Sequence, residues 1–187
     1  MAIKDDEFRR LIETHQRMVF SVALRIAGDY ANAEEIAQDV FLELHRSGEG
    51  LQSEDHIRYW LRRVATHRAI DSLRRKSLRP EAAAEEWVEE QHTGCEAAIS
   101  SSIGLEARLE TLLRGLPEPM RAAVVLRYQE EMLPDEIARL LGQTVASVKS
   151  HLHHGLKLLR RKAAVTMKEY VREPTRRADE QLGRAEV

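Results

Sequence analysis

The sequence predicts an all-α protein in which two small helical domains are joined by an acidic linker. Aromatic residues make up only 5% of the 187 residues and charged residues 32%, a composition that argues against β-sandwiches and β-barrels. Apolar residues recur at helical spacing in several segments that glycine and proline separate. Between them, residues 80–104 are rich in Glu, Ala, Ser and Gly and have little periodicity, which is typical of a linker.

The first predicted domain covers residues 1–79 and contains three helices. The first has an apolar stripe from Phe8 to Ile26 and ends at Gly28. Asn32 stands three residues before Glu35, a spacing that predicts an N-cap and its capping-box partner at the start of the second helix. The third helix is expected to begin near Ser53 or Asp55 and to end before residue 80, a proline.

The second predicted domain covers residues 105–167. Pro119 fits the first turn of a helix that runs to Tyr128. The linker at 80–104 is expected to hold at most one short helical piece, around residues 82–88. Residues 168–187 form a C-terminal tail without an apolar stripe, and we expect this tail to fray.

A helix-turn-helix motif is predicted at residues 134–153. Ala138 is small enough for close helix packing, Gly142 suits the left-handed turn, and Thr144 can cap the second helix. The polar face of that helix suits a DNA major groove, although an ordinary helical hairpin would share much of this pattern. The candidate DNA-contacting residues are Thr144, Ser147, Lys149, Ser150, His151, His154 and Lys157.

The net charge of −2 conceals large local charges of both signs. Residues 1–55 carry −6, residues 56–79 carry +7, residues 80–104 carry −6 and residues 144–168 carry +6. Two basic stretches suggest two contacts with one polyanion, unless each is simply a solvated helix face.

The sequence gives little indication of disulfide bonds, catalysis or metal binding. The single cysteine, Cys95, excludes an intramolecular disulfide and a cysteine-based zinc finger, and no orienting residue completes a nucleophile set around it. His151, His153 and His154 have no further ligand at metal-binding spacing. We therefore expect no enzyme activity, no metal and no cofactor. With no long apolar run and no secretory signal, we expect a cytoplasmic protein that is not inserted in a membrane.

Four stretches in a fixed order resemble the extracytoplasmic-function group (group 4) of bacterial sigma factors. The stretch 33–42 is similar to the polymerase-binding helix of that family, and 59–75 to its −10 element helix. Residues 116–128 are similar to the start of its C-terminal domain, which the helix-turn-helix completes. The resemblance spans roughly residues 8–162.

The resemblance implies a role for each domain. The first domain would bind the β′ coiled coil of core RNA polymerase through Glu35, Gln38, Asp39 and Phe41, with core packing as the alternative for Phe41. It would also bind the −10 element, where a flipped base enters the loop before the third helix. Trp60 is either a melting wedge or a core residue. The residues implied for the −10 contact are His56, Arg58, Trp60, Arg62, Arg63, His67 and Arg68.

Two departures from the family pattern concern DNA contacts. Thr66 and His67 replace a usual Arg-Asn pair, and His151 and His154 replace arginines of the −35 recognition helix. Neutral histidine offers fewer hydrogen-bond donors than arginine, so a different or pH-sensitive −35 preference is expected. The acidic linker either mimics RNA inside the polymerase or is a plain solvated connection.

The function that the resemblance implies is a sigma factor for promoter-specific transcription initiation. Its partners would be core RNA polymerase (the β′ coiled coil and the β flap), promoter DNA and an anti-sigma factor. Two alternatives are a sigma-like decoy that sequesters an anti-sigma partner and a helix-turn-helix regulator that binds an operator as a dimer.

Overall fold

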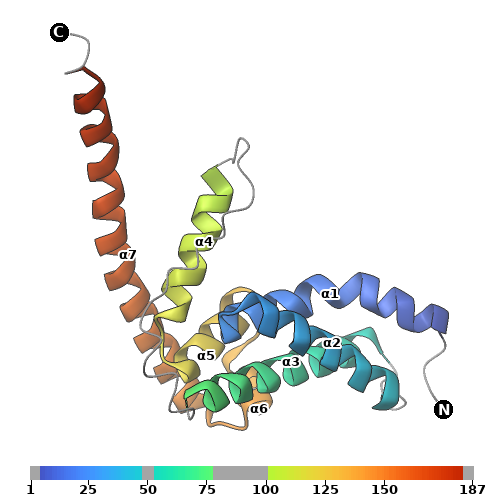
Figure 1. Ribbon diagram of the computed structural model, residues 1–187. Coiled ribbons are helices and arrows are strands. Elements are labelled where there is room, and N and C mark those ends of the chain that lie inside the picture. Colours follow the sequence, from blue (N-terminus) through green and yellow to red (C-terminus); the bar gives the residue numbers. More distant parts are fainter. Residues whose placement is uncertain (1–4, 48–52, 78–100, 183–187) are drawn as a thin grey trace.

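The computed structural model describes residues 5–47, 53–77 and 101–182, and in these ranges every regular element is a helix. The helices are α1 (Asp5–Ala27), α2 (Tyr30–Ser47), α3 (Glu54–Ser77), α4 (Ser101–Arg114), α5 (Glu118–Tyr128), α6 (Pro134–Leu141) and α7 (Val145–Leu182). Helices α1 to α3 form one bundle, α5 and α6 pack beside it, and α7 leads away from both (Figure 1). The predicted all-α fold is confirmed.

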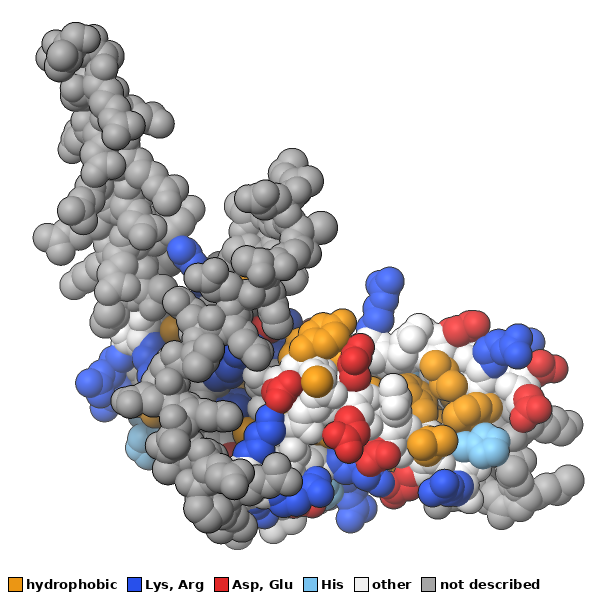
Figure 2. All heavy atoms as spheres, in the orientation of Figure 1, with side chains coloured by type: hydrophobic (Ala, Val, Ile, Leu, Met, Phe, Trp, Pro, Cys, Tyr) orange, Lys and Arg blue, Asp and Glu red, His pale blue; other side chains and the backbone are white. Residues whose placement is uncertain are grey.

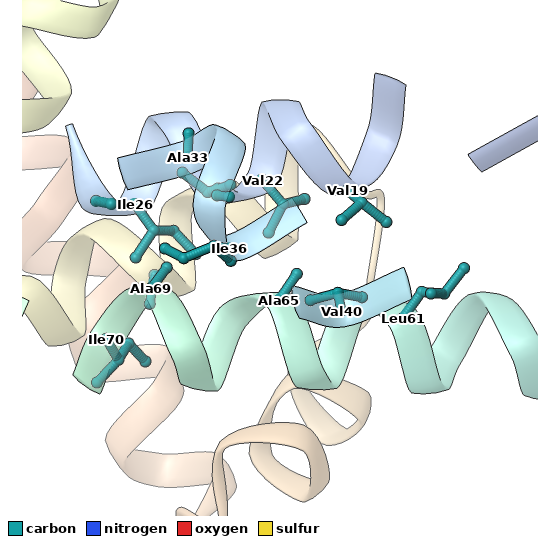
Figure 3. Packing of buried hydrophobic residues seen from close by; sticks show 14 of the residues in the cluster. Val19, Val22, Ile26, Ala33, Ile36, Val40, Leu61, Ala65, Ala69 and Ile70 are labelled. Atoms are coloured by element: carbon teal, nitrogen blue, oxygen red, sulfur yellow. The ribbon is translucent and has the colours of Figure 1, made fainter. Parts of the chain in front are cut away.

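The core of the first bundle lies between α1, α2 and α3 (Figure 3). Val19, Val22 and Ile26 of α1 face Val40 of α2 and Leu61 of α3, and all five side chains are fully buried. These residues belong to the apolar stripes that the sequence predicts, because residues three or four positions apart share one face of a helix.

The corner between α1 and α2 differs from the prediction in its cap. Gly28 has a φ of +75° and ends α1, so that Asp29 becomes the N-cap and α2 begins at Tyr30. The backbone N–H of Asn32 donates to Asp29 Oδ1 at 3.4 Å, and Lys76 Nζ donates to Asp29 Oδ2. The bond from Lys76 is the main cause that lowers the pKa of Asp29. The predicted N-cap at Asn32 is therefore wrong; its amide instead donates to Ser72 Oγ of α3 at 2.7 Å.

The helix-turn-helix is formed by α6 and α7 as predicted. Gly142 has a φ of +63°, in the left-handed region that glycine reaches without strain. Thr144 caps α7, since its Oγ1 accepts a hydrogen bond of 3.1 Å from the N–H of Ser147. Ile137 and Val148 are fully buried between the two helices.

Two helix ends depart from the predicted segmentation. Helix α4 begins at Ser101, within the range assigned to the linker, and α7 continues to Leu182, so the expectation of a frayed tail from residue 168 is wrong. Ala163, Ala164 and Lys168 favour continuation of the helix, whereas Pro174, in the interior of α7, lacks the N–H for a helical hydrogen bond, and its place there has no local explanation. The short helix expected at 82–88 lies outside the described residues, and the exact domain boundaries stay predictions.

The two helical units share one core, which the sequence alone did not predict. Leu113, Leu116 and Val125 belong to the same buried cluster as the α1–α3 core residues. Buried Arg121 of α5 crosses the junction, and its Nη1 donates to the carbonyl oxygen of Ile26 in the last turn of α1 at 2.7 Å. The chain is thus folded back so that its second unit packs on its first (Figure 1).

Buried His15 makes the stability of the first bundle sensitive to acid. Its side chain is 2% exposed, and burial, followed by the positive charges of Arg58 and Arg62 on α3, lowers its pKa, against an opposing influence of Glu54. The unfolded chain therefore takes up a proton near pH 6.5, where folded His15 is still neutral. The free energy of unfolding should fall as the pH decreases below that value.

Urea unfolding at pH 7.5 and 5.5 measures this effect. The variant His15→Leu should flatten the dependence and leave a smaller slope from His67, whose pKa burial also lowers. The exposed His153→Leu is the matched control. An unchanged slope in His15→Leu would contradict the assignment.

Candidate nucleic-acid and protein interfaces

The start of α7 presents a polar face next to its cap. Lys149, Ser150, His154 and Lys157 are exposed there. The Ser150 hydroxyl and His154 Nδ1 lie 3.2 Å apart, so the two side chains bond one turn apart on the same face. Four of the seven predicted contacts thus lie together on an accessible surface, as a groove-reading helix requires.

The remaining three predicted contacts are less accessible or play a capping role. Thr144 and Ser147 bond to each other through their hydroxyls at 2.8 Å at the helix start. His151 is only half-exposed, and its Nδ1 is buried without a hydrogen-bond partner. His151 therefore lies partly against the protein. Among the described residues, no cluster of three or more His, Cys, Asp or Glu side chains could hold a metal.

Helix α3 carries the residues predicted for the −10 contact, and these residues differ in how far they are exposed. His56, Arg58 and Arg63 are exposed. Ser53 caps the helix by accepting a 3.3 Å bond from the N–H of His56. Trp60 is half-buried and packs against the shared core, which favours the core interpretation over a melting wedge.

Arg68 joins α3 to α2. Its guanidinium donates to Asp39 Oδ2 at 2.7 Å and to Glu43 Oε2 at 2.6 Å. A residue predicted to bind DNA and one predicted to bind polymerase are therefore ion-paired with each other. Because 29 positions separate Arg68 from Asp39 in the sequence, spacing along the chain offered no sign of this pair.

Arg62 and His67 of α3 face the second unit of the chain. Arg62 Nε donates to Glu130 Oε2 at 2.7 Å, and only 19% and 6% of the two side chains are exposed. His67 is half-buried, with the backbone at Leu140 of α6 close enough to act on its pKa. Arg62 and His67, two of the seven residues predicted for the −10 contact, are therefore covered in this arrangement of the chain.

An apolar groove of about 770 Å³ runs between α1 and α2. Gln38 and Phe41, both predicted to bind polymerase, line it, although Phe41 is also 8% exposed and part of the core. Glu35 is exposed outside the groove and Asp39 is turned to Arg68. Figure 2 shows apolar side chains gathered over α1 and α2 among charged ones.

Most residues that line the groove were not predicted as site residues, and two of them are exposed large apolar side chains. Tyr30 and Leu42 are 55% and 52% exposed, which is unusual for large apolar side chains. Tyr30 contacts Phe20 ring to ring, with centroids 5.0 Å apart. Leu42 lies off the apolar stripe through Ile36, Val40 and Leu44, so its exposure agrees with the helical pattern of the sequence.

The described residues contain no helix that meets the length and hydropathy needed to cross a bilayer. Their fold, with its helix-turn-helix and exposed basic side chains on α3 and α7, is that of a helical DNA-binding protein, and α1 and α2 enclose an apolar groove. Residues 11–79 match the family described as Sigma-70 region 2, and residues 106–159 match Sigma-70, region 4.

Among curated proteins, the chain is similar to the ECF RNA polymerase sigma factor SigE of Mycolicibacterium smegmatis. The two are 33% identical over 153 residues, which are 80% of this chain and 59% of SigE. The chain is also 26% identical over 165 residues to SigW of Bacillus subtilis, covering 83% of this chain and 88% of SigW.

Solved structures share the fold. The sigma factor RpoE in complex with the anti-sigma factor NepR, from Bartonella quintana, aligns with a TM-score of 0.65 at 14% identity, over 84% of this chain and 97% of that chain. CnrH, solved with the cytosolic domain of CnrY, aligns with a TM-score of 0.61 at 20% identity, over 87% and 90% of the two chains. The two regions and the relatives agree: this chain belongs to the sigma-70 family, in its extracytoplasmic-function group.

Proposed function

We propose that this chain binds core RNA polymerase and directs it to promoters that carry a −10 and a −35 element. The observation that carries the proposal is the capped helix-turn-helix, which exposes Lys149 and its neighbours, in one chain with the basic helix α3. Such a protein is an adaptor without catalysis of its own, and it works in the cytoplasm, where bacterial RNA polymerase and DNA are.

The −35 element is assigned to the exposed face of α7. Lys149 and Lys157 supply positive charge, and Ser150 and His154 supply neutral hydrogen-bonding groups. Thr144 and Ser147 fix the helix start that enters the major groove. His151 contributes through packing on the protein side of the helix.

The −10 element is assigned to the exposed side of α3. Arg58 and Arg63 are accessible to phosphates, and exposed His56 lies in the first turn of α3. Arg68 supports the helix from α2, where Asp39 and Glu43 hold it. Trp60 fixes the helix from the core side.

The groove between α1 and α2 is proposed as the docking site for the β′ coiled coil. An apolar groove lined on one side by Phe8 and Phe20 and on the other by Phe41 and Leu42 fits the apolar face of a partner helix. Gln38 adds a polar contact at the same surface. The β flap would bind the second unit, and an anti-sigma factor is a further proposed partner, since RpoE was solved in complex with the anti-sigma factor NepR.

Run-off transcription with purified chain, core polymerase and a promoter library tests the function. Lys149→Ala and Arg63→Ala should each lower promoter-specific transcription roughly 5- to 30-fold, the equivalent of about 1–2 kcal/mol for one DNA contact. Arg10→Ala, which removes an exposed charge of α1 outside the groove, is the matched control.

Transcription no higher than that of core polymerase alone, from every promoter tested, would overturn the proposal. A decoy would give that result and still bind an anti-sigma partner in all three variants. An operator-binding regulator would instead select palindromic half-sites without polymerase.

A further inference from the structure

The turn between α5 and α6 lies against the basic side of the first unit. Gln129 Oε1 accepts a 2.7 Å hydrogen bond from Arg25 Nη1 of α1, and Gln129 Nε2 donates to Glu130 Oε1 at 2.9 Å. The other oxygen of Glu130 accepts from Arg62 Nε of α3 at 2.7 Å. A continuous chain of polar contacts therefore links α1, this turn (residues 129–132, the acidic turn) and α3.

The contact between Glu130 and Arg62 is enclosed, unlike the other ion pairs between the two units. Glu130 is 6% exposed at its side chain and Arg62 19%, whereas Arg74, which pairs with Glu118 across the same junction, is 62% exposed. A carboxylate that keeps both oxygens bonded in an enclosed place is held strongly, and removing one partner leaves a desolvated charge.

The backbone of the acidic turn is shaped to hold this position. Glu131 has a φ of +56°, the one non-glycine residue with positive φ in the described part of the chain. Residues other than glycine rarely adopt a positive φ unless the surrounding structure imposes it. Met132 anchors the turn in the second core, with 4% exposure and an N–H bonded to the Leu126 carbonyl oxygen at 3.1 Å.

The acidic turn covers part of the surface that the proposed function assigns to DNA. Arg62 lies on α3 one turn from Arg58, and its guanidinium is the group that would meet a phosphate. A carboxylate and a phosphate both accept charge-assisted hydrogen bonds from guanidinium N–H groups, so Glu130, bonded to Arg62 Nε, competes with a phosphate for this side chain. His67, one helical turn and a half further along, is covered by α6 in the same closed arrangement.

We propose that the acidic turn is an intramolecular latch: Glu130 occupies Arg62 in place of a nucleic-acid phosphate and keeps the two DNA-binding units closed on each other. Binding of single-stranded DNA by the full face of α3 then requires the latch to open. The proposal rests on the proposed function only for the identity of the competitor, and the closed state itself is measured without DNA.

The latch is tested first by the distance between the two units. Spin labels at Glu13 of α1 and Arg139 of α6, both exposed, are introduced into the full chain with Cys95 replaced by serine. Glu130→Gln should broaden the distance distribution and shift it to longer values. Glu131→Gln removes the same charge from the neighbouring, exposed carboxylate and should leave the distribution unchanged.

A charge exchange keeps the test decisive if single variants fold poorly. Glu130→Arg should open the chain, and the double variant Arg62→Glu with Glu130→Arg should close it again. An unaltered distance distribution in Glu130→Gln and in Glu130→Arg, with both proteins folded by circular dichroism, would overturn the latch.

The competition is tested with a fluorescein-labelled oligo-dT of 20 nucleotides as the probe. Glu130→Gln should bind it roughly 5- to 10-fold more tightly than Glu131→Gln, and the gain should vanish when Arg62→Gln is added. A gain that persists without Arg62, or equal affinities for the two single variants, would contradict the proposal. Opening and tighter binding without promoter-specific transcription would leave the latch standing and remove the proposed function.

Discussion

Replacing Arg121 by methionine should lower the free energy of unfolding by about 2–4 kcal/mol. The Arg121 guanidinium donates to the carbonyl oxygens of Ile26, Arg114 and Leu116, which lie at the end of α1 and at and just after the end of α4. The carbonyls of Ile26 and Arg114 have no partner inside their own helices, and a positive charge at helix C-termini is favourable. Methionine fills similar space but supplies no donor.

The size of this effect follows from burial. Arg121 is 8% exposed, and burial lowers its pKa, so the side chain already bears a desolvation cost that its three acceptors offset. Without Arg121, buried carbonyls stay unsatisfied, at a cost of about 1–3 kcal/mol for each, and loss of the desolvation cost of Arg121 itself offsets part of the sum. Lysine should recover only part of the loss, because its single amino group cannot reach acceptors in a fork.

Urea unfolding at pH 7.5 measures the loss. Arg139→Met, at a position of α6 where 70% of the side chain is exposed, is the control and should change the stability by less than about 0.5 kcal/mol. If Arg121→Met behaved like this control, the carbonyls would have found other donors and the junction would not depend on Arg121.

Replacing Leu42 by arginine should weaken binding to core polymerase about 10- to 100-fold and leave the fold intact. Leu42 is 52% exposed at the rim of the groove, so a charge there costs the free chain little. Against an apolar partner helix, the same charge loses its water and finds no counter-charge.

Phe41→Ala, at the adjacent position, should affect both docking and folding, unlike Leu42→Arg. Phe41 is 8% exposed and belongs to the core, so its truncation should also lower the free energy of unfolding by about 3–5 kcal/mol. Fluorescence anisotropy with labelled chain and core polymerase measures the affinity of Leu42→Arg and of Phe41→Ala for the polymerase. Leu109→Arg, at a position of α4 that is 40% exposed and outside the groove, is the control. Equal affinities for Leu42→Arg and Leu109→Arg would show that polymerase docks elsewhere.

The candidate sites were predictable to different degrees. The exposed face of α7 followed from the sequence, because a cap at Thr144 and a glycine at Gly142 fix where the helix starts and hence which side chains share a face. Of the residues predicted to bind polymerase, Gln38 and Phe41 line the groove. Glu35 and Asp39 do not, since a helix pattern cannot say which neighbour a polar side chain meets.

The sequence by itself determined the first three helices, the end of α1 at Gly28, the cap of α7 at Thr144 and the helix-turn-helix, whereas the start of α4 and the end of α7 differ from the prediction. The features that the sequence determined depend on residues within a few positions of one another. Only the tertiary structure decided which arginines are occupied. Arg68 meets Asp39 across 29 positions, Arg62 meets Glu130 across 68, and Arg121 meets Ile26 across 95. The basic stretch of +7 at residues 56–79 is read from the sequence, but the charge that α3 can offer to DNA depends on which carboxylates the folded chain brings against it.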